Sequence, residues 1–217
     1  MEFVFASSNA GKIREIEDLL GNRFQIKSQQ NWGIDPPEET ASTFLENALI
    51  KARNASSLTG LPAIADDSGL CVEALNGLPG VNSANYAGSA ETDARNMSKL
   101  LENMKGIENR RAFFICTLIA IRAPSDPAPI AVEGRWYGEI AREPKGNQGF
   151  GYDPIFFLGE LGCTAAELEI KKKNDLSHRA NALKDLIREI DGKIYLLVFT
   201  SIFRGAKKSV LTATLTR

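Results

Sequence analysis

The chain has 217 residues, with 26 basic and 27 acidic side chains and a formal net charge of -1 at pH 7. This balance argues against the broad basic surface of a nucleic-acid-binding protein, so any phosphate site must be local and we expect no nucleic-acid partner. The length allows one domain with a full core, which we expect to be two-lobed. Its three cysteines fit neither a disulfide framework nor a zinc motif, and a reducing cytoplasm is the expected location.

The N-terminus begins with a predicted strand at 2–6 and lacks the basic start and long apolar run of a signal peptide. A polar loop at 7–12 follows, and apolar spacing predicts a helix from 13 to 20. N–H groups at a helix start attract anions, and Lys12 adds a positive charge beside them. The loop lacks the glycines of a Walker P-loop. For this segment alone, a plain helix cap with a solvated lysine is therefore the favoured alternative.

Two glutamates stand out in a proline-containing acidic loop at 35–40. Glu38 is a candidate metal ligand, because divalent cations such as Mg²⁺ prefer carboxylate oxygens. Its neighbour Glu39 has the same chemistry, and spacing does not choose between the two. Either glutamate could instead be a solvated or helix-capping charge.

The segment 64–70 places two adjacent carboxylates, Asp66 and Asp67, and the hydroxyl of Ser68 after a short apolar run and just before Gly69. Adjacent carboxylates repel each other and cost desolvation free energy when buried, so they are tolerated where a divalent cation or a titration role offsets the repulsion. Asp, Ser and Gly are also ordinary turn residues. For this segment in isolation, a solvated turn is the favoured interpretation.

The other elements before residue 146 are predicted from hydrophobic periodicity and breaker residues. A helix at 42–59 places Asn47 and Lys51 four residues apart, hence on one face. The apolar stretch 111–123 and the alternating stretch 130–140 predict a hairpin of long strands. A short strand at 70–72, a glycine-punctuated loop at 75–88 and a helix at 92–105 complete this part of the chain.

A glycine-rich loop at 146–154 carries Phe150, Tyr152 and Asp153 ahead of an apolar segment. Aromatic rings on such a loop can stack on a flat base. Buried hairpin aromatics are the competing interpretation, and a common one.

Three lysines at 171–173 precede His178 and Arg179, which lie early on a predicted helix. This adjacent pair of planar donors can hydrogen-bond the ring carbonyls of a base, whereas the lysines alone would form a solvated face. One apolar stripe marks the helix, formed by Leu176, Ala180, Leu183, Ile187 and Ile190. His178 and Arg179 lie off that stripe.

Together these segments resemble one family, the inosine triphosphatase or Ham1 family of purine nucleoside triphosphate pyrophosphatases. Each motif is weak alone, but all six occur in the family's order over residues 1 to 191. They are Ser8-Asn9-Ala10-Gly11-Lys12, Phe44-Leu45-Glu46-Asn47-Ala48 with Lys51-Ala52, Ala65-Asp66-Asp67-Ser68-Gly69-Leu70, Gly77-Leu78-Pro79-Gly80-Val81, Gly149-Phe150-Gly151-Tyr152-Asp153-Pro154 and Ser177-His178-Arg179.

The resemblance implies an α/β fold with an elongated central mixed sheet, flanking helices and two lobes around a nucleotide cleft, and commonly a homodimer. It also implies Mg²⁺-dependent hydrolysis of purine nucleoside triphosphates such as ITP, dITP and XTP to the monophosphate and pyrophosphate. Such an activity would remove deaminated purines from the nucleotide pool. The pyrophosphatase domain would cover 1–191, and 192–217 would be an atypical C-terminal extension.

Carried over position by position, the resemblance implies that Asp67 is the general base and a metal ligand, and that Glu38 is the second metal carboxylate. The phosphate-side positions are Ser7, Ser8, Asn9, Ala10, Gly11, Lys12, Lys51 and Lys173, with Ser68 as a further substrate contact. The base-pocket positions are Phe150, Gly151, Tyr152, Asp153, His178 and Arg179. Asp66 receives no role; it is either structural or raises the pKa of Asp67.

The chemistry agrees with this assignment. Two carboxylates and a triphosphate suffice to hold Mg²⁺, and Asp67 can deprotonate a water aimed at the α-phosphorus. His178 and Arg179 can donate hydrogen bonds to the 6-keto group of hypoxanthine or xanthine but would meet the amino group of adenine donor to donor. Guanine also has a 6-keto group, so its rejection would depend on the 2-position, near Asp153.

Two features depart from the family pattern. Asn85 stands where the family usually has arginine, which puts the anchoring of its loop in doubt. The extension contains an apolar stretch at 194–203 that is too short to cross a bilayer, so we expect no membrane partner and instead an added hairpin packed on the body or on a partner subunit. A cloning or frame artefact is the alternative for this extension.

These departures motivate a second functional hypothesis, a non-catalytic purine-nucleotide sensor. A magnesium phosphatase that releases orthophosphate is a third hypothesis, prompted by the paired aspartates alone. The Asp-x-Asp pattern of the haloacid dehalogenase type is missing from the Asp66-Asp67 segment.

Overall fold

The computed structural model describes residues 2–20, 24–88 and 92–192. The strands are β1 (Glu2–Phe5), β2 (Gln25–Ser28), β3 (Ala63–Val72), β4 (Arg111–Ile121), β5 (Ile130–Ile140), β6 (Phe156–Leu158) and β7 (Cys163–Thr164). They form one sheet in the order β2-β1-β3-β4-β5-β6-β7. Because β1 pairs in parallel with β2 and β3 while the pairings from β3 to β7 are antiparallel, the sheet is mixed.

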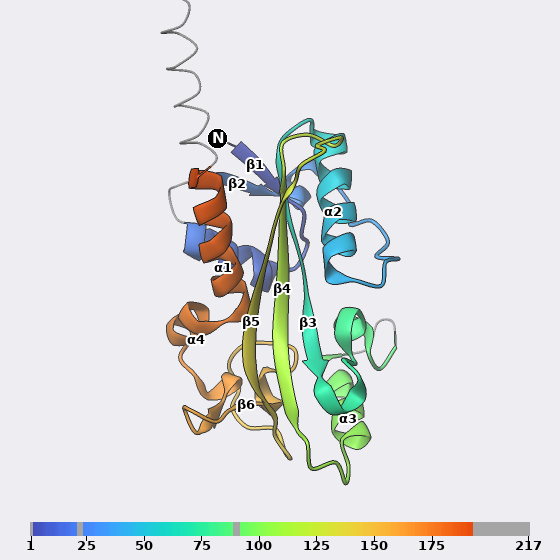
Figure 1. Ribbon diagram of the computed structural model, residues 1–217, viewed down its shortest axis with the longest axis vertical. Coiled ribbons are helices and arrows are strands. Elements are labelled where there is room, and N and C mark those ends of the chain that lie inside the picture. Colours follow the sequence, from blue (N-terminus) through green and yellow to red (C-terminus); the bar gives the residue numbers. More distant parts are fainter. Residues whose placement is uncertain (1, 21–23, 89–91, 193–217) are drawn as a thin grey trace, which may run out of the picture.

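The labelled helices are α1 (Ala10–Leu20), α2 (Phe44–Thr59), α3 (Asp93–Asn103) and α4 (Ile170–Leu176). A further helix covers 178–192, up to the last described residue. The three long strands β3, β4 and β5 form the spine of an elongated molecule (Figure 1), with α1, α2 and the 178–192 helix around one end and α3 and β6 near the other. The arrangement confirms the expected α/β fold with an elongated mixed sheet.

At the first end, helices cover both faces of the sheet because β-strand side chains alternate between faces. The alanine face of α2 packs on one of them, where Ala48, Ala52 and Ala55 are fully buried with Ala65. Alanine is small, so α2 lies close to the sheet and its polar residues come close to β3. On the opposite face, α1 and the 178–192 helix form a second cluster, which includes Ile16, Leu183, Leu186, Phe5 and Ile64.

At the other end, a third core cluster forms around the far ends of the long strands. It joins β3, β4 and β5 to α3, β6 and the glycine-rich loop through Leu70, Leu100, Phe114, Trp136, Tyr152, Ile155 and Phe156. The molecule therefore has a core cluster at this end and two at the other, which gives the expected two lobes a physical basis.

The most informative correction concerns the paired aspartates. The turn that was favoured for 64–70 in isolation is wrong, because β3 runs through the whole segment and pairs with β4 from Ala63 to Val72. Turn residues can occupy a strand when tertiary contacts satisfy them. Here Asp66 and Asp67 are both buried in ion pairs with lysines.

A second correction concerns the C-terminal helix, because the predicted apolar stripe does not lie on one helix. α4 ends at Leu176, and Ser177 has extended backbone angles before a new helix begins at residue 178. The hydroxyl of Ser177 accepts a hydrogen bond from the N–H of Ala180 and so caps that new helix. Leu176 is accordingly part of α4, where it is partly exposed.

The hairpin expected in the C-terminal extension lies outside the described residues, which end at 192. In residues 2–20, 24–88 and 92–192, no helix has the length and apolar character needed to span a bilayer.

Candidate active site

A cavity of about 340 Å³ lies between the two lobes, beside the open edge of β3. Among the described residues, β1 pairs with β3 at Ala63 and Ile64 only, and the following stretch 66–69 pairs with β4 on one side and lines the cavity. Side chains from both faces of β3 can therefore reach the same cavity.

The lining of the cavity includes most of the residues expected from the sequence: Ser7, Ser8, Asn9, Lys12, Lys51, Asp67, Ser68, Phe150, Gly151, Tyr152, Asp153, Lys173, His178 and Arg179. Ala10, Gly11 and Glu38 are not part of the lining.

Asp67 projects toward α2, which presents two donors one turn apart. Lys51 Nζ donates to Asp67 Oδ1 at 2.9 Å, and Asn47 Nδ2 donates to Asp67 Oδ2 at 3.4 Å. Burial raises the pKa of the Asp67 carboxyl above its ordinary value, and the charge of Lys51 opposes this shift only in part. Asp67 is thus a buried carboxylate whose affinity for a proton is increased.

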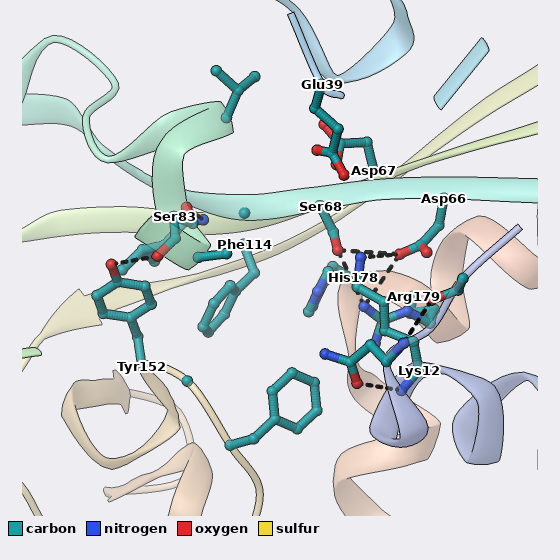
Figure 2. A pocket seen from close by; sticks show the side chains of 18 of the residues that line it. Lys12, Glu39, Asp66, Asp67, Ser68, Ser83, Phe114, Tyr152, His178 and Arg179 are labelled. Atoms are coloured by element: carbon teal, nitrogen blue, oxygen red, sulfur yellow. Dashed lines mark hydrogen bonds and ion pairs between the residues drawn. The ribbon is translucent and has the colours of Figure 1, made fainter. Parts of the chain in front are cut away.

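Asp66 projects from the opposite side of β3 into a different set of partners, as Figure 2 shows. It forms ion pairs with Lys12 at 2.9 Å and Arg179 at 3.4 Å, and accepts a hydrogen bond from Ser68 at 3.2 Å. Burial alone would raise the pKa of the Asp66 carboxyl, but the charges of Lys12, Arg179 and Lys51 together hold it well below its usual range. Asp66 therefore stays ionised as the counter-ion of Lys12 and Arg179.

In the acidic loop, Glu39 and not Glu38 lies at the cavity. Glu39 Oε1 accepts a hydrogen bond from Lys51 Nζ at 3.2 Å, so Glu39 and Asp67 share one lysine. Both glutamates are exposed, with the Glu39 side chain at 40%, but only Glu39 belongs to the cavity lining. The loop geometry thus separates two glutamates that spacing leaves equivalent.

The polar loop before α1 forms the expected helix cap and also places Lys12 in the cavity. Asn9 Oδ1 accepts hydrogen bonds from the N–H groups of Gly11 at 2.9 Å and Lys12 at 3.1 Å, and so caps α1. Lys12 is not a solvated lysine, because its Nζ is paired with Asp66. Since Asn9 occupies two of the first helical N–H groups, a phosphate at this loop would depend mainly on Lys12 and on hydroxyls such as that of Ser8.

Comparison with known proteins shows the family of this chain. Residues 3–189 match the sequence model of the Ham1 family. The Ham1 family is the one to which this chain belongs. A dITP/XTP pyrophosphatase of Photorhabdus laumondii is 53% identical over 187 residues, which are 85% of this chain and 95% of the relative. A dITP/XTP pyrophosphatase of Escherichia coli K12 is 50% identical over 187 residues, which again are 85% of this chain and 95% of the relative. A HAM1 protein structure from Coxiella burnetii has a TM-score of 0.84 at 46% identity, covering 88% of this chain and 99% of that one.

Within the Ham1 fold of this chain, His178 and Arg179 form the buried wall of the cavity. The His178 ring stacks on Phe114, with ring centroids 5.0 Å apart and planes 14° apart. Burial and the neighbouring charges of Arg179 and Lys173 hold the pKa of His178 well below its ordinary value, so the imidazole is neutral at pH 7. His178 Nδ1 and Arg179 Nε have no hydrogen-bond partner among the described residues. An unpaired buried N–H is costly, so a ligand that accepted a hydrogen bond from Arg179 Nε–H would remove that cost, and His178 Nδ1 could donate in the same way in the tautomer that carries its proton.

Lys173 lies with the glycine-rich loop rather than with the other two lysines. Its Nζ is 2.7 Å from Asp153 Oδ2 and 4.7 Å from the centre of the Phe150 ring. Asp153 in turn accepts a hydrogen bond from the N–H of Phe150 at 2.9 Å. The structure therefore groups Lys173 with residues expected around the base, although the resemblance implies a phosphate-side position for it.

Sequence reasoning missed Phe114, which lines the cavity, and Glu15, which contacts two lining residues from behind the lining. Phe114 lies within the apolar run of β4, where nothing distinguishes a ring that supports His178 from an ordinary core residue. Glu15 is bonded to Arg179 and lies 3.6 Å from Lys173. Its position one turn after Lys12 on α1 is a signal that could have found it.

The loop that carries Asn85 is anchored by hydrogen bonds from Ser83 and from α3. The Ser83 hydroxyl accepts a hydrogen bond from the N–H of Leu70 at 2.9 Å and donates to Gly80 O at 2.6 Å. Asn96 on α3 accepts from Ala87 N at 2.7 Å and donates to Ala84 O at 2.9 Å. Asn85 itself is exposed. Lys99 on α3 adds a hydrogen bond from its Nζ to Tyr86 O at 2.5 Å, so side chains other than that of residue 85 hold the loop.

Proposed function

We propose that this protein hydrolyses deaminated purine nucleoside triphosphates, such as dITP, ITP and XTP, to the monophosphate and pyrophosphate. The observation that carries the proposal is one cavity that combines Asp67, Lys12 and Lys51 with Phe150 and the unpaired donors of the His178-Arg179 wall. Ham1-family relatives about half identical to this chain are named dITP/XTP pyrophosphatases, which supports the same substrate class. The biological role is removal of damaged purines before polymerases use them.

A divalent cation, with Mg²⁺ as the proposed cofactor, fits the carboxylates of the cavity. Among the described residues, no group of three or more His, Cys, Asp or Glu side chains could hold a metal ion. Mg²⁺ does not need such a group, because it keeps several waters and takes phosphate oxygens from a nucleotide. Asp67 would be one protein ligand, and a glutamate of the acidic loop would be the other. When bound, Mg²⁺ neutralises charge on the triphosphate and on the departing pyrophosphate.

In the proposed mechanism, Asp67 accepts the proton of the attacking water. The water oxygen forms a bond to the α-phosphorus while the bond from that phosphorus to the bridging oxygen of pyrophosphate breaks, which yields nucleoside monophosphate and pyrophosphate. Burial raises the pKa of Asp67, and a base whose pKa is closer to the working pH accepts a proton more readily. Lys51 holds Asp67 Oδ1 at 2.9 Å and, with Lys12, can offset negative charge on the phosphates.

Selectivity for 6-keto purines would come from the buried wall. Arg179 Nε–H, and His178 when Nδ1 carries its proton, can donate to the 6-keto oxygen of hypoxanthine or xanthine. The amino group of adenine is a donor and would leave these buried donors unpaired, which discriminates strongly against ATP. Phe150, which is 40% exposed, offers a ring for stacking on the base.

We further propose a cytoplasmic homodimer that binds neither nucleic acid nor membranes. The formal net charge of -1 argues against a broad basic surface that would bind polyanions such as nucleic acids. The three cysteines are free, as is ordinary in a reducing compartment.

A product assay tests the function directly. The protein is incubated with Mg²⁺ and, separately, with ITP, dITP, XTP, GTP and ATP, and the products are identified by ion chromatography. We expect pyrophosphate and monophosphate from ITP, dITP and XTP, with kcat/KM for ATP lower by at least about 10²-fold. Orthophosphate release would instead identify a phosphatase, and tight ITP binding without turnover would identify a sensor.

The two glutamates of the acidic loop can be separated by mutation. We expect Glu39→Gln to raise the Mg²⁺ concentration for half-maximal activity by about tenfold or more, because loss of a supporting metal contact commonly has an effect of this size. Glu38→Gln is the matched control and should stay within about twofold of the wild type. Mn²⁺ binding followed by electron paramagnetic resonance gives a readout independent of turnover. The opposite ranking of the two variants would return the ligand role to Glu38.

A further inference from the structure

Asn47 is a buried polar residue on α2 to which neither the fold nor the proposed chemistry assigns a role. Its side chain is 1% exposed. Asn47 Oδ1 accepts a hydrogen bond from Ala41 N at 3.0 Å, and Asn47 Nδ2 donates to Ala41 O at 3.3 Å. Because an N–H must face Oδ1, the amide orientation is determined, and Nδ2 is the atom that faces Asp67 Oδ2 at 3.4 Å.

Asn47 and Lys51 both contact Asp67 and the acidic loop, and they do so from one face of α2. They lie four residues apart, hence one helical turn apart, and they hold the two different oxygens of Asp67. Each residue also holds the acidic loop, since Asn47 binds the backbone of Ala41 and Lys51 binds the carboxylate of Glu39. A rigid helix thus sets the position of the loop relative to Asp67.

The acidic loop needs such a support because it has no regular structure of its own. Residues 34–41 belong to neither a helix nor a strand, and the side chain of Glu39 is partly exposed. Without the two hydrogen bonds between Asn47 and Ala41, the hydrogen bond from Lys51 to Glu39 would be the remaining side-chain contact of the loop with α2 among the described residues. Loop carboxylates held only by one flexible lysine would be poorly placed to share a ligand with Asp67.

We propose that Asn47 is a positioning residue that fixes the acidic loop against Asp67, so that a loop carboxylate and Asp67 bind the same divalent cation. This inference rests on the proposed function, in which those carboxylates hold Mg²⁺. Asn47 itself contacts Asp67 and the loop backbone and is not part of the cavity lining. Its removal should therefore weaken cation binding more than nucleotide binding.

The chain offers a matched control in Asn96, a second buried asparagine that clamps a loop in the same way. Asn96 is 2% exposed, accepts from Ala87 N and donates to Ala84 O. Within the described residues, the side chain of Asn96 forms these hydrogen bonds with backbone atoms and none with a carboxylate. Asn96→Ala and Asn47→Ala thus remove equivalent loop clamps, but only Asn47→Ala also removes a contact with Asp67.

The test compares Mn²⁺ binding to the full-length wild type, Asn47→Ala and Asn96→Ala by electron paramagnetic resonance, without nucleotide and with a non-hydrolysable ITP analogue. We expect Asn47→Ala to weaken Mn²⁺ binding by about tenfold or more, with binding of the analogue at saturating Mn²⁺ changed less than about threefold. Asn96→Ala should lose a comparable amount of thermal stability and keep wild-type Mn²⁺ affinity.

Wild-type Mn²⁺ affinity in folded Asn47→Ala would overturn the proposal and leave Asn47 as a structural clamp. Equal weakening by Asn96→Ala would overturn it as well, because the effect would then follow general loss of stability. A wild type that binds Mn²⁺ but does not hydrolyse ITP would contradict the proposed function alone. The two failures are therefore distinguishable, since the binding titration does not depend on turnover.

Discussion

Asp67→Asn is expected to lower kcat for ITP by about 10²- to 10⁴-fold, the range of a lost general base, and to leave binding of a non-hydrolysable ITP analogue nearly unchanged. Asparagine has almost the same shape as aspartate and can still accept a hydrogen bond from Lys51 through its amide oxygen. Its amide nitrogen would then face the donor group of Asn47. Asparagine cannot accept the proton of the attacking water at neutral pH. Single-turnover rates measured with saturating Mg²⁺, together with calorimetric binding of the analogue, separate the two effects.

Asp126→Asn is the matched control for this substitution. Asp126 is also a buried aspartate, 5% exposed, and its carboxylate is bonded to Arg122 in the loop between β4 and β5. It is not part of the cavity lining, so kcat should remain that of the wild type. An Asp67→Asn enzyme as fast as Asp126→Asn would rule out Asp67 as the base.

The second large effect is expected from Gly134→Ala, a substitution in the middle of β5. A Cβ atom at Gly134 would come far inside van der Waals contact with the backbone oxygen of His178 and the backbone nitrogen of Ala182. Backbone cannot move aside as a flexible side chain can, so the 178–192 helix must shift. We expect a loss of unfolding free energy of about 1–3 kcal/mol, typical of an overpacked interior, measured by urea denaturation.

The same shift should reach the cavity, because His178 and Arg179 are in the first turn of that helix. We expect the ratio of kcat/KM for ITP to that for ATP to fall in Gly134→Ala. Gly159→Ala is the control, since an added Cβ there meets nothing within 4 Å. Equal stability and equal ITP/ATP ratios in the two variants would show that the close approach of Gly134 to the helix is dispensable.

The long elements were predictable from the sequence because each has its own periodic signal. The hairpin of β4 and β5 follows from an apolar run beside an alternating one, and α2 follows from the spacing of its alanines. The break between α4 and the following helix was not predicted. It depends on a single capping residue, Ser177, within an otherwise continuous apolar pattern.

The candidate site was predictable only in part, and mainly through the family resemblance rather than through periodicity. The cavity does bring together residues as far apart as Lys12 and Arg179. Which glutamate faces it was not predictable, because the course of the acidic loop depends on the hydrogen bonds between Asn47 and Ala41. The partners of Asp66 were not predictable either, because they are distant in the sequence and come from α1 and from the 178–192 helix.

The alternation of side chains along β3 limits which insertions and deletions this strand can accept. Asp66 pairs with Leu118 of β4 and Asp67 with Thr117, and the two carboxylates have unlike partners on either side of the strand. A slip of one residue in this pairing would exchange the two environments, because strand side chains alternate with a period of two. An insertion or deletion that shifted β3 would keep both aspartates and still leave each beside the wrong lysine. Neighbours that are chemically identical are thus not interchangeable, and the strand tolerates changes of length less readily than many changes of side chain.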